Sequence, residues 1–159
     1  MPDPKNLEAG IWKRCQKEII VALVIIFLFT VWMGSARNSG VEFQFGEEQM
    51  SILGPSGAPG PVVVDYTDIL ALYQRSGLEL GSGESGLDTN KCRFGSWNNT
   101  EFGDYTLCAV PAASEYIVME TVQGTVVFNY QDDDATLHLY TALLELLESK
   151  DVVVSSYAG

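Results

Sequence analysis

An uncharged apolar run near the N-terminus constrains this chain more than any other feature. Residues 19–33 read IIVALVIIFLFTVWM, and Gly34, Ser35 and Ala36 extend the uncharged stretch over residues 19–36. As a helix with a rise of about 1.5 Å per residue, this stretch spans roughly 27 Å, close to the ~30 Å hydrocarbon core of a bilayer. A helix that is apolar on every face is typical of a membrane span. We therefore predict a single transmembrane helix over residues 19–36, with the lipid bilayer as its partner.

The charges that flank this run predict its orientation. Residues 1–18 carry four basic side chains, whereas the other flank carries Arg37 before a long acid-rich stretch. Because cytoplasmic flanks are enriched in Lys and Arg, we expect a cytoplasmic N-terminus and an extracytoplasmic C-terminal domain at the cell membrane. A cleavable signal peptide that ends at Gly34-Ser35-Ala36 would instead give a secreted domain, and this alternative stays open.

The acidity of the chain lies in the part that follows the apolar run. The 159 residues have a formal net charge of −12, and residues 38–159 hold eighteen acidic and four basic side chains, a net charge of −14. Phosphate binding needs clustered Lys and Arg, so this charge argues against nucleic acid as a partner and against anionic lipid headgroups. Three cysteines are too few for a scaffold built on disulfides.

After the linker, the sequence reads as short strands followed by one helix. Runs that alternate apolar and polar residues, or that are rich in β-branched residues, predict strands. These runs are 41–45, 49–53, 61–64, 69–73, 104–110, 115–120 and 125–130. Residues 76–103 are rich in glycine, and we expect a long loop there with one irregular strand near 91–95. Residues 135–149 place leucines at helical spacing behind three aspartates that suit a helix N-terminus.

These elements predict an α+β fold. We expect a small antiparallel β-barrel of about seven strands, with a C-terminal α-helix that caps one open end and buries its leucine face there. The predicted organisation is a cytoplasmic segment, a transmembrane helix, a linker, the folded domain and a C-terminal tail. Their bounds are 1–18, 19–36, 37–40, 41–150 and 151–159.

Four pieces of residues 41–148 resemble a bacterial pleckstrin-homology-like (PH-like) domain. The pieces, in chain order, are Phe43-x-Phe45-Gly46-Glu47-Glu48 with Met50-Ser51-Ile52; Asp65-Tyr66-Thr67-Asp68-Ile69; Phe94-Gly95-x-Trp97 with Gly103-x-Tyr105-x-Leu107; and Tyr116-Ile117-Val118 with Val127-Phe128-Asn129. An acidic turn and a Leu-rich helix follow the last piece, and the resemblance covers roughly two thirds of the chain. It implies a seven-stranded bent barrel with a C-terminal capping helix, and it implies no enzymatic activity.

The resemblance also bears on the ligand. Related eukaryotic domains often bind phosphoinositides through basic residues between the first two strands. The corresponding stretch here is Gly46-Glu47-Glu48-Gln49, which is acidic and argues against phosphoinositide binding. Protein or peptide binding, which PH-like folds also support, is the function that remains.

Two cysteines of the folded domain are candidates for a disulfide. If residues 91–95 and 104–110 pair as a hairpin centred near Thr100, Cys92 and Cys108 fall opposite each other. Outside the cytoplasm they could oxidise and close the intervening loop. Two separate buried thiols are the alternative.

Four aromatic residues gather in the glycine-rich region. Phe94, Trp97, Phe102 and Tyr105 are candidates for an exposed patch that binds a partner, and filling of the core is the alternative.

The remaining motifs predict no catalytic, cofactor or metal residues. Gly81-x-Gly83-x-x-Gly86 has the spacing of a dinucleotide fingerprint, but no helical pattern follows it, so we interpret it as a loop. His138 has no neighbouring nucleophile or orienting acid in the sequence, and the aspartates 132–134 suit helix capping better than calcium.

The sequence therefore predicts a membrane-anchored binding or scaffolding module that is not an enzyme, has no cofactor and binds a protein partner. An accessory subunit of a larger membrane protein complex is the first alternative. A signal-peptide-bearing secreted domain or an uncharacterised enzyme is the second.

Overall fold

The computed structural model describes residues 40–155, which lie within one compact unit. The predicted cytoplasmic segment 1–18 and transmembrane helix 19–36 fall outside the described residues, as does the end of the C-terminal tail. Among the residues that are described, no helix has both the length and the apolar character that crossing a bilayer requires.

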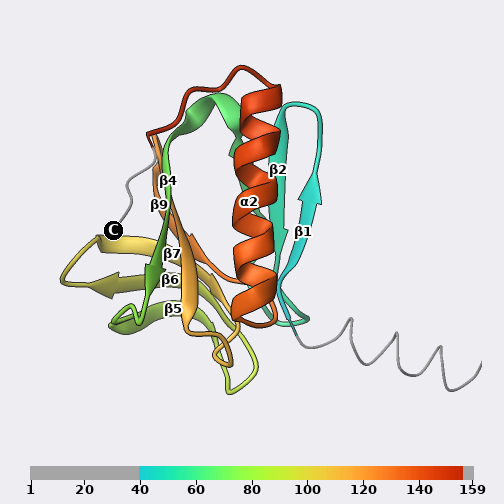
Figure 1. The fold of residues 1–159 in the computed structure, drawn as a ribbon. Helices are drawn as coiled ribbons and strands as arrows, with labels where there is room; N and C mark the ends of the chain where they lie inside the picture. The colour runs from blue at the N-terminus through green and yellow to red at the C-terminus, as the bar shows by residue number, and fades with distance from the viewer. Residues whose placement is uncertain (1–39, 156–159) are drawn as a thin grey trace, which may run out of the picture. The chain divides into compact units, whose positions relative to one another are not determined.

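The described chain forms two sheets and one long helix (Figure 1). A three-stranded antiparallel sheet, which we call sheet A, has the order β1-β2-β3, with β1 Glu42–Phe45, β2 Gln49–Leu53 and β3 Val62–Asp65. A six-stranded sheet, sheet B, has the order β4-β8-β9-β7-β6-β5. Its strands are β4 Ile69–Ser76, β5 Ser82–Asp88, β6 Arg93–Asn99, β7 Gly103–Ala109, β8 Glu115–Thr121 and β9 Gly124–Phe128. The 3₁₀ turn η1 (Tyr66–Asp68) joins the two sheets, and helix α2 (Asp133–Ser149) follows β9.

The α+β class is confirmed, but the predicted closed barrel is wrong. Nine strands of the described chain divide between two sheets, and β3 of sheet A pairs with no strand of sheet B. In addition, β9 lies between β8 and β7 and pairs with β7 in parallel, over Thr106–Cys108 and Val126–Phe128. A single antiparallel meander would have needed each strand to pair with its neighbour in the sequence.

The expected loop over residues 76–103 contains two paired strands. β5 pairs with β6 in antiparallel register, and Gly86 lies opposite Gly95. Both glycines have positive φ, 118° and 145°, and a Cβ at Gly95 would lie 2.2 Å from the carbonyl oxygen of Ser85. The glycines therefore allow two strands to approach closely. Because Gly83 and Gly86 belong to a strand, the fingerprint-like spacing forms no phosphate-binding turn.

Sheet B has a hydrophobic cluster on each face. On its inner face, side chains of sheet B pack with sheet A and with the leucines of α2, and Ile52, Phe128, Leu143 and Leu147 are all at most 1% exposed. The outer face carries a smaller cluster of apolar side chains that includes Trp97 and Tyr105. Leu78 and Leu80, from the connection between β4 and β5, pack against this cluster. Burying one such large side chain contributes about 1.5–3 kcal/mol.

Helix α2 begins at Asp133, two residues before the predicted start, and ends at Ser149 as predicted. The Asp132 carboxylate accepts a hydrogen bond from the Ala135 N–H at 2.8 Å, which makes it the N-cap. Asp133 accepts from the N–H groups of Ser114 and Glu115 at 2.6 and 2.9 Å. These bonds lower the pKa of Asp133 and tie the start of the helix to the start of β8.

The C-terminal tail covers the outer edge of β4. The Leu72 N–H donates to the Ser155 carbonyl, and the Ser155 N–H donates to the Leu70 carbonyl, both at 3.2 Å. The tail therefore makes a short parallel bridge with Ala71 and leaves this part of the edge of sheet B occupied.

Candidate functional site

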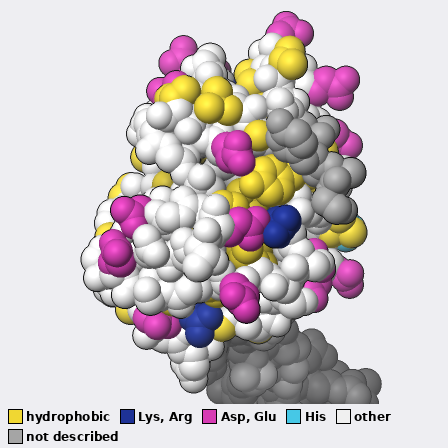
Figure 2. All heavy atoms as spheres, turned by 90° about the vertical axis from the view of Figure 1, so that its left-hand side faces the viewer, with side chains coloured by type: hydrophobic (Ala, Val, Ile, Leu, Met, Phe, Trp, Pro, Cys, Tyr) yellow, Lys and Arg dark blue, Asp and Glu magenta, His cyan; other side chains and the backbone are white. Residues whose placement is uncertain are grey.

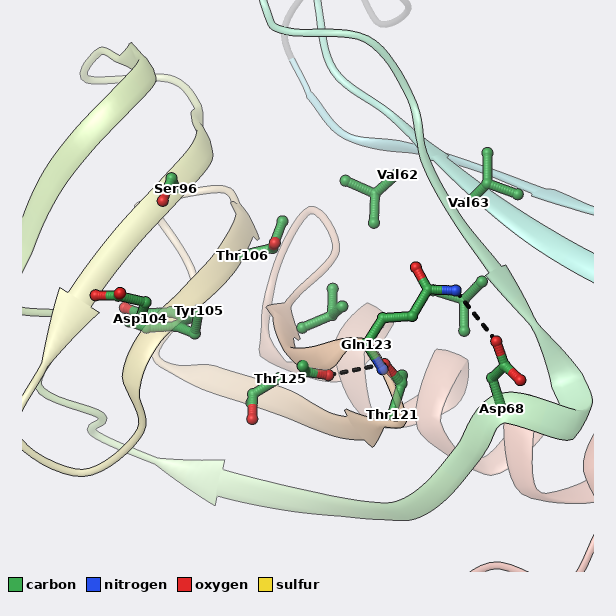
Figure 3. A pocket seen from close by; sticks show the side chains of 13 residues that line it. Val62, Val63, Asp68, Ser96, Asp104, Tyr105, Thr106, Thr121, Gln123 and Thr125 are labelled. Atoms are coloured by element: carbon green, nitrogen blue, oxygen red, sulfur yellow. Dashed lines mark hydrogen bonds between the residues drawn. The ribbon is translucent and has the colours of Figure 1, made fainter.

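An open cleft of about 270 Å³ lies where the two sheets separate. One wall is the β3 segment Val62–Val64 of sheet A. The other walls come from sheet B and are polar, with Ser96 and Thr106 on β6 and β7 and Thr125 on β9 (Figure 3). The cleft therefore occupies the gap that a closed barrel would have filled with paired strands.

The polar character of the cleft follows from the alternation along β6 and β7. On the inner face of sheet B, Phe94 lies opposite Cys108, and both are buried in the main core. Two residues further along the same face, Ser96 lies opposite Thr106, and Asp104 follows at the end. The same face of one hairpin thus changes from apolar to polar, and the core ends where the cleft begins.

The β8–β9 turn closes one end of the cleft and is held firmly. The Gln123 side-chain amide donates to the Asp68 carboxylate at 3.1 Å, and the Val122 N–H donates to the Asp68 carbonyl at 3.0 Å. Within the turn, the Thr121 hydroxyl donates to the Gly124 carbonyl at 2.8 Å, and Gly124 has a φ of 135°. These bonds fasten the turn to η1, so this end of the cleft is preorganised.

The cleft is acidic. Asp68 and Asp104 are the charged residues that line it, and no Lys or Arg does. The basic side chains Arg75 and Arg93 pair with other acids, at 2.8 and 3.2 Å. Asp104 accepts a hydrogen bond from the Asn98 side-chain amide at 2.6 Å and stays exposed. On the face of the molecule that Figure 2 shows, acidic side chains are spread widely and basic ones are few. The cleft therefore attracts cations and repels phosphates.

The cleft presents polar groups that can donate or accept hydrogen bonds. Its side chains offer hydroxyls, a primary amide and two carboxylates. In residues 40–155, no cluster of three or more His, Cys, Asp or Glu side chains could hold a metal ion. His138, for which the sequence predicts no catalytic role, is exposed on α2 and does not line the cleft. At about 270 Å³ the cleft is slightly smaller than the ~300–1,000 Å³ of small-molecule sites, so it suits part of a longer chain better.

Three of the four aromatic candidates do not form an exposed patch. Phe94, Trp97 and Tyr105 are 1%, 4% and 4% exposed. The Tyr105 hydroxyl donates to the Leu80 carbonyl at 2.6 Å, and burial raises the pKa of Tyr105 to about 12. Phe102 is half-buried and makes an edge-to-face contact with Tyr105 at 5.6 Å between centroids. The aromatics fill the two hydrophobic clusters, because β6 and β7 direct alternate side chains to opposite faces.

The two cysteines are both buried and free. They are not directly opposite each other, because the register of the hairpin pairs Cys108 with Phe94. Cys92 comes two residues before Phe94, just outside β6, and belongs to the same buried cluster as Cys108. Burial raises the pKa of both thiols, that of Cys92 to about 11, which disfavours the thiolate that oxidation needs. A disulfide between them stays a prediction.

Of the residues that line the cleft, the sequence analysis selected Tyr105 alone as a binding candidate. A signal for the polar wall was available in the alternation along β6 and β7. Polar residues stand at alternate positions there, and the buried Trp97 and Tyr105 lie between them on the other face of the sheet; the polar residues are Ser96 and Asn98 on β6, and Asp104 and Thr106 on β7. Comparison of the chain with family models, with curated proteins and with solved structures found no match.

Proposed function

We propose that this protein is a non-enzymatic binding module that residues 19–36 anchor in the cell membrane, with residues 1–18 in the cytoplasm and the folded domain outside. The cleft between sheets A and B is its binding site, and a segment of a partner protein is its ligand. The observation that carries this proposal is the combination of an acidic, hydroxyl-lined cleft with an unpaired strand edge, β3, along one wall.

The charge of the cleft favours a protein over a lipid headgroup. A phosphoinositide needs Lys or Arg at the site, and here the charged lining residues are Asp68 and Asp104. The turn between β1 and β2, where related PH-like domains carry basic residues, contains Glu47 and Glu48. The two acidic positions make phosphoinositide binding a poor fit at either place.

The PH-like interpretation is compatible with part of the architecture. Two sheets packed around one core, with a C-terminal helix over that core, accord with it. The parallel pairing of β7 with β9 and the open edge of β3 differ from the expected barrel. The proposed binding function rests on the cleft and does not need the family assignment.

An accessory subunit of a membrane complex is the second candidate, and the exposed apolar side chains of the domain are what favours it. Leu70, Val122 and Leu137 are each about half exposed or more, at 53%, 62% and 47%. A dedicated subunit would co-purify with its complex in fixed stoichiometry in mild detergent, whereas a transient binder would elute mostly alone.

Site-specific photo-crosslinking in intact cells tests the proposal. A benzophenone amino acid replaces Thr125, which lines the cleft, in one variant of the full chain, and Leu137, which does not, in a matched control. We expect a discrete protein adduct from position 125 that the control lacks, with the crosslinked partner peptide identified by mass spectrometry. The absence of an adduct at 125, or the same adducts from both positions, would contradict a binding site in the cleft.

A further inference from the structure

The outer edge of β3 is open. In sheet A, β2 lies on one side of β3, and none of the strands within residues 40–155 lies on the other. The cleft borders this open side, because Val62–Val64 form its wall there (Figure 3). An open edge presents backbone N–H and C=O groups to any extended chain that lies beside it.

Two hydrogen bonds fix the direction of the backbone groups along the strands of sheet A. The Tyr66 N–H donates to the Glu48 carbonyl at 3.0 Å, at the end of the β2–β3 pair. The Gly46 N–H donates to the Gln49 carbonyl at 2.9 Å, across the β1–β2 turn. Hydrogen-bonded and non-hydrogen-bonded pairs alternate along an antiparallel ladder. Both bonds lead to the same assignment, in which Met50 is directed at β3 and its partner residue on β3 is directed back at β2.

The assignment divides the residues of β3 into two sets. Val62 and Val64 lie opposite Ile52 and Met50, whose backbone groups point at β3. Val62 and Val64 therefore use their own backbone groups in the ladder of sheet A. Val63 and Asp65 therefore present their N–H and C=O groups to the open side. The side chain of Val63 is 43% exposed, and that of Asp65 is exposed, so neither is held in the core.

The edge of β3 lacks the devices that protect the edges of sheet B. The edge of β4 is occupied by the C-terminal tail at Ser155, and the register of β5 is irregular between Gly83 and Ser85. β3 reads Val-Val-Val-Asp, without lysine, and its register with β2 has no bulge. Its three valines favour the extended conformation, so the backbone of β3 is already shaped for pairing with an additional strand.

Sheet B leaves room opposite this edge. β7 and β9 pair with each other only over Thr106–Cys108 and Val126–Phe128. The residues that precede these stretches do not pair across the two strands. Those preceding residues, Asp104 and Thr125 among them, line the far side of the cleft. An added strand would lie ~4.8 Å from β3.

The charges select the chemistry of that strand. Asp68 and Asp104 line the cleft without an ion-pair partner in the described chain, and Asp65 lies at the end of the open edge. Residues 38–159 as a whole carry a net charge of −14. A segment with Lys or Arg side chains gains from these charges, and an acidic segment is repelled.

We propose that the cleft takes a basic, extended segment of the partner protein, which adds to β3 as a fourth strand of sheet A. Main-chain hydrogen bonds to Val63 and Asp65 hold the segment, and its Lys or Arg side chains face Asp68 and Asp104. This inference rests on the proposed function and specifies how the partner is recognised.

Selection from a library of random displayed peptides, with the full chain in detergent micelles as bait, is the first test. We expect enriched peptides that carry Lys or Arg at alternate positions and that lack proline in the paired stretch. Their affinity falls as salt is added, because the ion pairs are screened. Enrichment of acidic peptides, of amphipathic helical peptides or of no peptide would overturn the proposal.

Proline substitutions at the edge are the second test. Val63→Pro removes an outward N–H at an edge position where proline is tolerated, and Val63→Thr is its matched control with the N–H retained. We expect about a tenfold loss of affinity for the selected peptide with proline and little change with threonine. Asp65→Pro, with Asp65→Ala as its control for the lost charge, repeats the test independently of the fold of the first variant. Equal binding by the proline variants and their controls would overturn strand addition.

The outcomes separate this inference from the function on which it rests. If the crosslink at position 125 persists in Val63→Pro at full intensity, the cleft binds a partner but not by strand addition. If the position-125 variant gives no crosslink even with Val63 in place, the proposed function itself fails.

Discussion

Proline substitution at two adjacent residues of β3 should destabilise the domain at one position and leave it as stable or slightly more stable at the other. Val64 is 5% exposed, and our assignment directs its N–H to β2. Asp65 is exposed, has a φ of −72° that proline adopts, and directs its N–H outward. The same substitution therefore removes a ladder hydrogen bond at one position and no intramolecular bond at the next.

The magnitudes follow from these environments. In Val64→Pro, the carbonyl of Met50, a fully buried residue, loses its donor at a cost of about 1–3 kcal/mol, and repacking of the buried side chain adds about 1 kcal/mol or more. In Asp65→Pro, the compatible φ leaves the free energy of unfolding unchanged or raises it by up to about 1 kcal/mol. We expect the two variants to differ by about 3 kcal/mol, or about 10 °C in Tm.

Urea unfolding of the full chain in mild detergent, followed by near-ultraviolet circular dichroism, measures this difference. Asp65→Ala serves as the control for the lost carboxylate, and we expect it to unfold close to the unaltered protein. If Asp65→Pro is destabilised as much as Val64→Pro, the assignment of the outward backbone groups is wrong, and strand addition at β3 loses its basis.

Three further predictions concern other parts of the molecule. Gly95→Ala should destabilise the domain by more than about 2 kcal/mol, because its φ is 145° and the new Cβ would meet the Ser85 carbonyl at 2.2 Å; near-normal thermal unfolding would contradict this. Asp133 accepts hydrogen bonds from the Glu115 N–H and from Ser114, which hold its pKa below the ordinary value of 3.8. Its contribution to stability is therefore present above that pH and is lost as the pH falls through the lowered pKa. Asp133→Asn should therefore flatten the loss of Tm in acid, whereas an unchanged pH profile would show that this carboxylate contributes nothing. Val153 is 94% exposed, so Val153→Cys in a chain whose Cys15 is replaced by serine should react with a membrane-impermeant maleimide in intact cells. Labelling only after lysis would reverse the predicted topology.

The sequence predicted most of the strands and the helix because their residues carry the pattern themselves. Alternation in β2 and the helical spacing of leucines in α2 each arise from one buried face. β8 is recognisable for another reason, because both of its faces are buried and its middle is a run of apolar residues. β5 was missed because six of its seven residues, Ser82–Asp88, are exposed and little in their polarity marks a strand. It forms because β6 offers a pairing edge and because Gly86 and Gly95 permit close approach.

The cleft could not be predicted, because it depends on contacts between distant segments. β9 pairs with β7 in parallel, and no strand of sheet A pairs with sheet B within residues 40–155; local sequence carries no signal for either arrangement. The sequence also did not predict the face of the sheet on which each aromatic side chain lies. Phe94 and Trp97 belong to the same strand but lie on its opposite faces. Given the pairing of β6 with β7, the sequence would have indicated one wall of the cleft, because Ser96 and Thr106 then lie side by side as polar residues.

Hydrogen exchange of the backbone amides of β3 tests the central claim most directly. The full chain is compared alone and saturated with the selected basic peptide, and exchange is resolved at Val62, Val63, Val64 and Asp65. We predict that the amides of Val63 and Asp65 slow by about tenfold or more on binding, while those of Val62 and Val64, already in the ladder, change little. Protection elsewhere in the domain, with Val63 and Asp65 unchanged, would contradict binding at the open edge of β3.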